Sequence, residues 1–568
     1  MPRRPLLPAS AVVATFALGT LASSAAHADG VPGDLPRLIL DTGRVQPAPA
    51  EPDLVRFQLH GEEQLRYEHL SSFLLDPTPS LVAARPGAYF DSLGQNDFVS
   101  HWLRLTPTLQ ITDKLQLIGQ ADLTGVLLGE TAHDTYADQT PRDDYNGYSN
   151  VQPRWLYLDW LTPVGLLRVG QQPSHWGMGI LANDGDHPSL FGDYRYGNIV
   201  EQVLFATKPL GEKSPFVVAL AGNLVYRDNV AVLTRGDHAW QGILAAFYEQ
   251  GQDMLGVYGV YRHQSRDRSS EASYFPYADT IDVGVVDVAG HFARPIALPD
   301  ETAYVFGSFE AATEVGSTNA ERTIYQVSSG NRTDIRTYGG AAAMGVVFAG
   351  HTVPADTSLE AARRAAAANA RPDLYGRFVA QVEVGYASGD ADPYDGTEKR
   401  FVFDPNHKVG LILFDEVMRW QTARSAVAAQ DPNLSNGSRP PPGVDLLPSN
   451  GGVYGAEYVN PTAIVRPRPW LDLKAGAVIA QTTADYVDPY RVAVQGAYVN
   501  FQGGNSKRHD LGLELDGGLE ARFPLDYGFR LQLGAQGGVL FPGGALADAS
   551  GGTMKTPWIV IGRAGLLF

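Results

Sequence analysis

The 568-residue chain contains no cysteine, so it forms no disulfide and cannot carry the lipid-attachment cysteine of a bacterial lipoprotein. Long apolar runs are also missing. Beyond the first thirty residues, no segment offers the roughly 18 or more continuous apolar residues that a membrane-spanning helix needs, and the mean hydropathy is −0.15. Arginine far outnumbers lysine, and the net charge of −18 argues against nucleic acid as a partner.

The N-terminus has the three parts of an export signal. Arg3 and Arg4 are basic, residues 11–21 form an apolar stretch, and Ala26-His27-Ala28 supplies a small-x-small cleavage pattern. The sequence therefore predicts a signal peptide over residues 1–28. Residues 29–53, with a Pro-rich stretch at 46–53, are predicted to be a flexible periplasmic lead-in, and residues 54–568 a single β-barrel.

Period-two alternation is the strongest structural signal. In residues 511–522, Leu513, Leu515 and Leu519 alternate with Glu514 and Asp516, and similar runs cover residues 55–68, 114–124 and 529–541. One face of each run is apolar and the other polar over roughly ten residues, as in a tilted membrane-spanning strand. The prediction is an all-β fold, a transmembrane antiparallel barrel of about 18 strands, with 16 as the alternative.

The connections between the predicted strands support this division into strands, because they alternate between short turns and long loops, as in bacterial outer-membrane barrels. The long loops are predicted to be extracellular. The predicted strands start near residues 54, 98, 114, 153, 164, 200, 214, 240, 253, 280, 300, 335, 374, 453, 470, 508, 526 and 557.

One connection departs from the alternation. Residues 350–373 should form a short periplasmic turn but are long, and Thr357-Ser358-Leu359-Glu360 is a capping-box pattern that predicts a short helix at 357–370. This stretch is either a solvated periplasmic excursion, which we favour, or a plug below the pore. A second helix is predicted at residues 414–429, inside the long 388–452 loop.

The end of the chain carries an assembly motif. Trp558, Val560, Leu566 and Phe568 lie on one face of the last predicted strand, opposite Arg563. A terminal aromatic residue after such alternation resembles the C-terminal signal that the barrel-assembly machinery reads in outer-membrane proteins. Phe568 is the candidate assembly signal.

A barrel of 16–18 strands leaves an aqueous channel, and charged residues on the polar faces are predicted to line it. Their charges are nearly balanced, which favours a wetted wall with cross-strand ion pairs over strong ion selectivity. The candidate lumen-lining residues are Arg56, Arg66, Arg104, Lys114, Asp122, Arg168, Arg377, Glu383, Lys474, Glu514, Arg522, Arg530 and Arg563.

The loop at residues 172–199 is the candidate constriction, because a loop of this length folds into the lumen in many porins. Its candidate residues are His175, Trp176, Asp184 and Asp186. Asn183, Asp184 and Asp186 could offer oxygen ligands to calcium, but their spacing does not match an EF-hand loop. No metal and no cofactor is predicted.

Two segments resemble the alginate-export porin family. They are Gly385-Tyr386-Ala387-Ser388-Gly389-Asp390, followed by Gly396, Phe401 and Phe403, and Arg168-Val169-Gly170-Gln171-Gln172, in which Gln171 stands where that group has Arg. The resemblance implies an 18-stranded barrel that passes an anionic polysaccharide through an arginine-rich lumen, sometimes with a periplasmic plug. We carry over the architecture only, because the balanced lumenal charge predicted here does not suit that substrate.

The leading functional hypothesis is a porin in the Gram-negative outer membrane for passive diffusion of small hydrophilic or sugar-like solutes. The alternative is a plugged barrel that acts as a surface or assembly scaffold. An outer-membrane enzyme is disfavoured, because no Ser-His-acid trio is recognisable. The expected partners are outer-membrane lipid, lipopolysaccharide, the barrel-assembly machinery and a small hydrophilic solute.

Overall fold

A computed structural model describes residues 55–73, 94–129, 150–187, 189–192, 196–211, 213–250, 253–266, 279–297, 302–319, 332–349, 376–430, 448–468, 470–525 and 529–568. The predicted signal peptide, the lead-in and the helix at 357–370 lie outside these ranges, so all three remain predictions.

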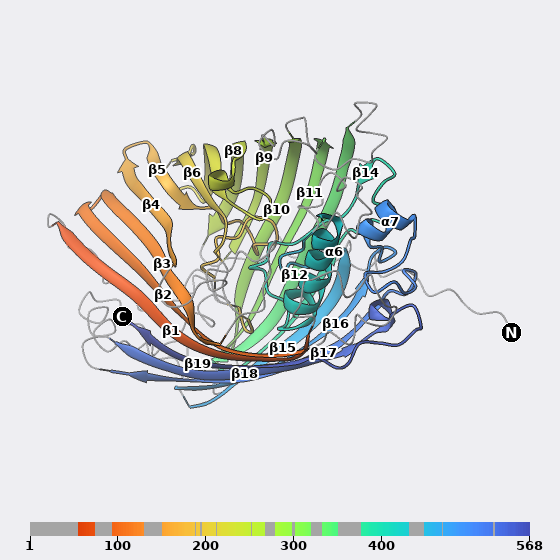
Figure 1. Cartoon of the computed structure of the whole chain (residues 1–568). Coiled ribbons are helices and arrows are strands. Elements are labelled where there is room, and N and C mark those ends of the chain that lie inside the picture. The colour runs from red at the N-terminus through yellow and green to blue at the C-terminus, as the bar shows by residue number, and fades with distance from the viewer. Residues whose placement is uncertain are drawn as a thin grey trace.

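The described residues form eighteen long strands in one antiparallel sheet (Figure 1). The sheet closes on itself because β1 pairs with both β2 and β19. The long strands are β1 (Arg56–Phe73), β2 (Gly94–Thr112), β3 (Leu115–Gly129), β4 (Asn150–Thr162), β5 (Gly165–Pro173), β6 (Ile199–Thr207), β7 (Phe216–Arg227), β8 (Asp237–Gln250), β9 (Asp253–Arg266), β10 (Asp279–Ala297), β11 (Thr302–Thr318), β12 (Thr333–Ala349), β13 (Gly376–Ala387), β15 (Ala456–Arg468), β16 (Leu471–Thr482), β17 (Asp510–Pro524), β18 (Arg530–Pro542) and β19 (Trp558–Leu567).

The predicted fold class is therefore confirmed with eighteen strands, and the sixteen-strand alternative is wrong. Every long strand starts within four residues of its predicted position. A two-residue strand, β14 (Thr397–Glu398), pairs in parallel with β12. It lies in the connection between β13 and β15 and adds no wall strand, because β13 pairs directly with β15.

The predicted alternation appears as two different faces of the wall. On β1, Phe57, Leu65 and Tyr67 are exposed on the outside, whereas Arg66 and Glu68 are buried on the inside. An apolar outer face and a polar inner face are the arrangement of a barrel surrounded by lipid. Among the described residues, no helix is both long and apolar enough to cross a membrane.

Five short helical elements lie in the described parts of the connections. They are η3 (Leu233–Arg235), η6 (Leu413–Met418), α6 (Arg419–Gln430), α7 (Pro489–Gln495) and η9 (Gly544–Leu546). The helix predicted at 414–429 is confirmed by η6, which is a π-helix, and by α6. The largest apolar cluster among the residues that the structure describes includes Phe414 and Val417 of η6 together with Val478 of β16 and Leu540 of β18. The core of this barrel thus lies inside it, between the wall and η6.

The C-terminal residue takes part in closing the barrel. Phe568 donates its backbone N–H to Gly61 O at 3.0 Å and accepts from Gly61 N at 2.9 Å, which extends the β1–β19 pairing. The Phe568 ring covers the Gly61 backbone, so that a Cβ atom at residue 61 would lie 2.3 Å from the ring. Glycine at residue 61 therefore makes room for the terminal aromatic ring.

Replacing Gly61 by valine is expected to displace the Phe568 ring and weaken closure of the sheet. Overpacking of this kind typically costs about 1–3 kcal/mol. We expect a lower yield of folded, heat-modifiable protein and a lower urea midpoint. The matched control is Gly562→Ala on β19, where the nearest atom to the new Cβ is 3.9 Å away. Equal folding yields for G61V and G562A would contradict this role of Gly61.

Candidate functional site

The connection between β5 and β6 enters the barrel and reaches distant parts of the wall. We refer to its described residues, 174–187, 189–192 and 196–198, as the infolded loop. The Trp176 indole N–H donates to Asp287 of β10 at 3.1 Å, and the Ile180 N–H donates to Glu310 of β11 at 3.3 Å. On β19, Arg563 donates to Gly192 O at 2.7 Å. None of β10, β11 and β19 neighbours β5 or β6 in the sheet, so the loop spans the lumen.

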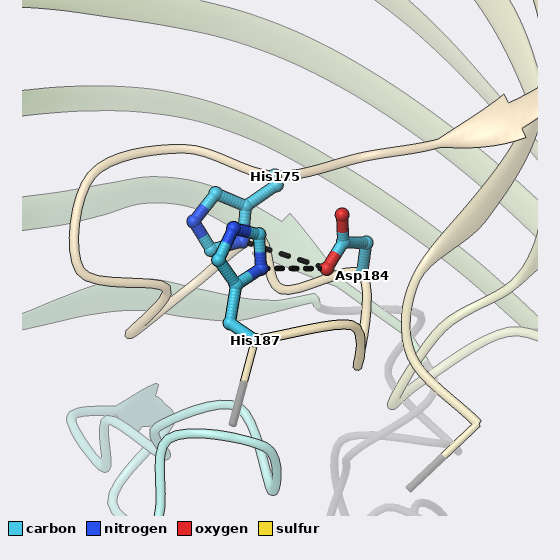
Figure 2. Close-up of side chains that lie close together, drawn as sticks. All are labelled: His175, Asp184 and His187. Carbon is cyan, nitrogen blue, oxygen red and sulfur yellow. Dashed lines mark hydrogen bonds and ion pairs between the residues drawn. The ribbon is translucent and has the colours of Figure 1, made fainter. Parts of the chain in front are cut away.

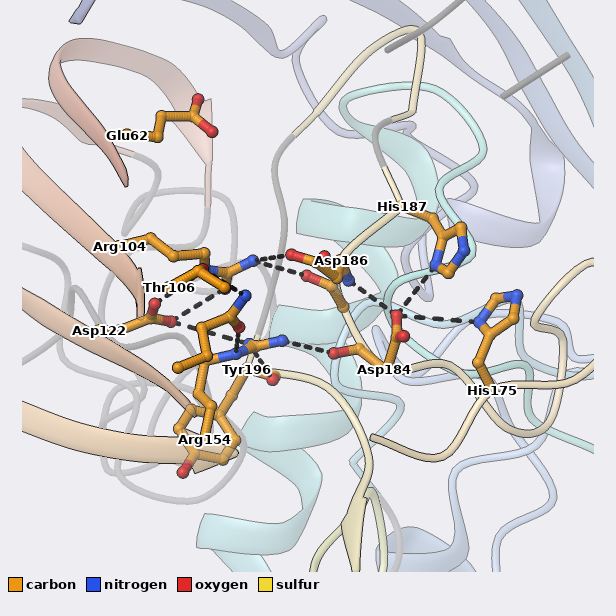
Figure 3. Close-up of polar contacts among 12 residues, drawn as sticks. Glu62, Arg104, Thr106, Asp122, Arg154, His175, Asp184, Asp186, His187 and Tyr196 are labelled. Carbon is orange, nitrogen blue, oxygen red and sulfur yellow. Dashed lines mark hydrogen bonds and ion pairs between the residues drawn. The ribbon is translucent and has the colours of Figure 1, made fainter. Parts of the chain in front are cut away.

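Two arginines fix the infolded loop to the wall on the side of β2, β3 and β4 (Figure 3). Arg104 donates to both carboxylate oxygens of Asp122, at 2.8 and 2.9 Å, and to Asp186 at 2.7 Å. Arg154 donates to the backbone carbonyl of Asp184 at 2.7 Å and lies 3.7 Å from Asp122. Both guanidinium groups are buried, and buried charges need such partners to offset their desolvation.

Asp184 is the centre of the loop's internal contacts. Its Oδ1 accepts from the Asp186 N–H at 2.9 Å and lies 2.9 Å from His187 Nδ1 and 3.9 Å from His175 Nδ1. Burial raises the pKa of Asp184, but the hydrogen bond from His187 and the charges of His175 and His187 outweigh burial. The pKa of Asp184 therefore lies well below its ordinary value, and Asp184 is a carboxylate at neutral pH.

A second connection, between β13 and β15, also folds into the barrel. We refer to its described residues, 388–430 and 448–455, as the infolded segment. The carboxylate of Glu514 on β17 accepts the backbone N–H groups of Leu411, Ile412 and Leu413 at 2.5, 2.8 and 2.7 Å. Three convergent N–H donors on one buried carboxylate make a strong, charge-assisted anchor. The lumenal Glu514 thus fastens the start of η6 to the wall.

The two infolded regions contact each other. The Asp404 N–H donates to Ile180 O at 2.7 Å, and His407 Nδ1 donates to Met178 O at 3.1 Å. The Nε2 atom of His407 lies 3.0 Å from Glu383 of β13, which also accepts from the Tyr458 hydroxyl at 2.6 Å. The loop and the segment are therefore joined to each other and to the wall.

The pH dependence of this junction follows from Asp404. Burial raises the pKa of the Asp404 carboxyl to about 7, against hydrogen bonds from Asn406 that favour the charged form. Because this pKa is raised above its ordinary value, the folded state holds a proton that the unfolded chain has already lost. The stability that this bound proton contributes is complete below the ordinary carboxyl pKa and is lost progressively as the pH rises to about 7.

We expect hydrogen exchange of the Asp404 amide, corrected for its intrinsic rate, to accelerate by up to about tenfold per pH unit as the pH rises from about 4 to about 7, and to level off above about 7. The variant Asp404→Asn has no proton to lose and should show little pH dependence. An equal pH dependence in D404N and the unaltered protein would contradict the assignment.

Ion pairs also cover the lumenal face of β15–β17. Arg466 and Arg522 both bind Asp472, at 2.8 and 2.7 Å, and Lys474 lies 2.9 Å from Glu520. Opposite charges therefore meet across neighbouring strands, as expected for a wall with nearly balanced lumenal charge.

The residues predicted to line the lumen differ in where the structure places them. Arg66, Arg104, Asp122, Glu514, Arg522 and Arg530 are buried, whereas Arg56, Arg168, Glu383, Lys474 and Arg563 are partly buried. Lys114 lies exposed in the turn between β2 and β3, so no strand pairing places it on the lumenal face. The side chain of Arg377 lies outside the described residues.

Sequence reasoning missed several residues that now stand out. Arg154 was not predicted to line the lumen, nor were Asp287, Glu310 and His407 assigned any role. Only the 172–199 loop was predicted to enter the barrel, whereas residues 401–423 of the infolded segment are almost all buried as well. The one related prediction was the helix at 414–429, which carried no indication that this stretch lies inside the barrel.

No family model matches the chain, and no curated protein matches it. Among solved structures, it is similar to Acinetobacter baumannii OccAB2, with 9% identity over 90% of this chain and 98% of that chain and a TM-score of 0.45. It is also similar to two Pseudomonas aeruginosa proteins. For the outer membrane protein OprD the identity is 10% over 91% and 96% of the two chains, with a TM-score of 0.43; for OccK5 (OpdH) it is 10% over 90% and 98%, with a TM-score of 0.41.

At these identities and scores, the likenesses carry no argument about this chain, and the fold rests on the strand pairing described above. The names of these structures lend no support to the resemblance to alginate-export porins.

Proposed function

We propose that the chain is an outer-membrane porin that lets small hydrophilic solutes diffuse across the Gram-negative outer membrane. The observation that carries the proposal is the closed eighteen-strand wall, apolar outside and charged inside, with the infolded loop spanning its lumen. Barrels of 16–18 strands hold an aqueous channel, whereas eight-stranded barrels are filled by side chains. The infolded loop is the proposed constriction.

Export by the predicted signal peptide and insertion by the barrel-assembly machinery belong to the same proposal, as do outer-membrane lipid and lipopolysaccharide as surroundings. The lumenal ion pairs Arg104–Asp122, Arg466–Asp472 and Lys474–Glu520 favour weak ion selectivity, because paired charges leave little net field in the channel.

One observation favours a second candidate, a plugged barrel that acts as a scaffold. The infolded segment fills part of the lumen, with Phe401, Phe403 and Phe414 almost fully buried. A plug of this kind would block solutes until it moved. Solute flux separates the two candidates.

The proposal is tested by liposome swelling with the folded protein and sugars of increasing size. A porin should give swelling rates that fall steeply from monosaccharides to trisaccharides, in proportion to the amount of protein added. Swelling equal to that of protein-free liposomes for every sugar would overturn the porin proposal in favour of the plugged barrel.

A further inference from the structure

Three side chains of the infolded loop bring nitrogen and oxygen ligands to one place. One ligand atom from each of His175, Asp184 and His187 lies within 4.8 Å of the others. The two imidazole rings are stacked with their centroids 3.8 Å apart and 17° between their planes. Figure 2 shows both Nδ1 atoms directed at the same carboxylate oxygen, at 3.9 Å from His175 and 2.9 Å from His187.

These distances suit a single metal ion. In a tetrahedral zinc site, ligand bonds of about 2.0–2.1 Å place neighbouring ligand atoms roughly 3.3 Å apart. The two nitrogen–oxygen distances lie on either side of that value. Because a metal lies in the plane of each imidazole that binds it, the His175 and His187 rings would rotate out of their stacked arrangement when the ion binds. Two imidazoles and one carboxylate also form the ligand set of zinc sites that keep an open position.

The ligand type selects the class of metal. Imidazole suits zinc, nickel and copper, whereas calcium and magnesium prefer oxygen alone. The oxygen ligands considered for calcium are otherwise engaged: Asp186 binds Arg104 at 2.7 Å, and Asn183 Oδ1 accepts from the Gly185 N–H at 3.1 Å. The site therefore fits a transition metal and not calcium.

The loop holds the three ligands in place from several sides. The residues next to His175 are fixed by the Ser174 N–H donating to Asn198 O at 3.0 Å and the Trp176 N–H donating to Ala182 O at 3.0 Å. The Asp184 carbonyl accepts from Arg154 at 2.7 Å. A site whose ligands are positioned before binding loses less entropy when the metal arrives.

We propose that His175, Asp184 and His187 bind one divalent transition metal of the zinc class in the constriction loop. The two histidine side chains are 23% and 25% exposed, so an ion can reach them and a coordination position remains open to solvent. A bound ion joins residue 175, near the end of β5, to residue 187, and so stiffens the loop across the lumen. Metal binding does not depend on the channel being open.

Isothermal titration of the folded, full-length barrel in detergent with zinc chloride tests the site, using protein without a histidine tag. We expect one zinc ion per chain with a dissociation constant of about 1 μM or below, weakening at acid pH as protons compete for the imidazoles. His175→Ala and His187→Ala should each weaken binding by at least about tenfold, and the double variant should abolish it.

The control is His263→Ala, which removes a histidine that lies 2.7 Å from Asp282 and belongs to no such cluster within the described part of the chain. Cobalt(II) absorption of the tetrahedral type in the unaltered protein and in H263A, and its loss in the double variant, would confirm the shared site. Heat-modifiable gel mobility establishes that each variant is folded. The absence of saturable one-to-one binding, or equal affinities of H175A, H187A and H263A, would overturn the proposal.

Discussion

Replacing Glu514 by alanine is expected to release the start of η6 from the barrel wall. The variant leaves the buried N–H groups of Leu411, Ile412 and Leu413 without their shared acceptor. Hydrogen bonds to a charged group contribute about 1.5–3 kcal/mol each, and because such contributions do not simply add, we expect a local loss of about 3 kcal/mol. Hydrogen exchange of these three amides should accelerate roughly a hundredfold, and the single-channel conductance should rise or become noisy.

The matched control is Glu520→Ala, on the same strand and the same lumenal face. Glu520 pairs with Lys474 and Arg522 and has no hydrogen bond to η6 among the described contacts. If E520A accelerates hydrogen exchange at residues 411–413 as much as E514A does, Glu514 is not the specific anchor of η6. The effect would then follow from the loss of any lumenal carboxylate.

The second large effect concerns Arg154, which ties the middle and the C-terminal end of the infolded loop to β4. Its guanidinium group donates to the carbonyls of Asp184 and Tyr196 and lies beside Asp122. Arg154→Leu should loosen the loop and leave Asp122 with one arginine fewer, and removing one partner from a buried ionic network costs about 3–5 kcal/mol. We expect proteolysis within residues 174–198 at least tenfold faster than in the unaltered protein, with frequent changes in conductance level.

Arg168→Leu provides the comparison for this variant. Arg168 is also an arginine in the β4–β5 hairpin, but it pairs with Asp159 at 2.6 Å on the wall, away from the infolded loop. Its loss should change loop proteolysis by less than about twofold. A loop that remains as resistant in R154L as in R168L would show that Arg154 does not hold it.

The wall could be predicted from the sequence because its determinants are local. Alternation such as Leu513, Glu514, Leu515 and Asp516 repeats every second residue, and one face must meet lipid while the other meets water. Short turns such as the one at residues 113–114 then fix which ends of the strands are joined. Strand number and order follow from these two local signals.

The contents of the lumen could not be predicted in the same way. Glu514 and the amides it binds are about one hundred residues apart. A pattern of side chains in the sequence does not show which backbone N–H groups will donate to a given carboxylate. The lumenal position of Arg154 could not be predicted for a different reason. Arg154 lies at a β-bulge, because Gln120 pairs with Trp155 and Ala121 pairs with Pro153. The bulge interrupts the alternation of inner and outer faces, so the two-residue period does not assign Arg154 to the lumenal face.

The candidate constriction was predicted by loop length and composition, and its residues do lie inside the barrel: Trp176 contacts Asp287, and Asp186 contacts Arg104. The pairing of His175 with His187 was not predicted, because residues twelve apart in a loop have no fixed spatial relation until the turn at Gly179 and Asn183 is formed.

The most direct test of the channel is single-channel conductance of the folded protein in a planar bilayer, with heat-modifiable gel mobility to confirm the barrel. A lumen that conducts around the infolded loop should give steady, ohmic openings with weak ion selectivity, and R154L should change their size or stability. A fully folded barrel that gives no openings, with or without Arg154, would contradict the porin and leave the plugged barrel in its place.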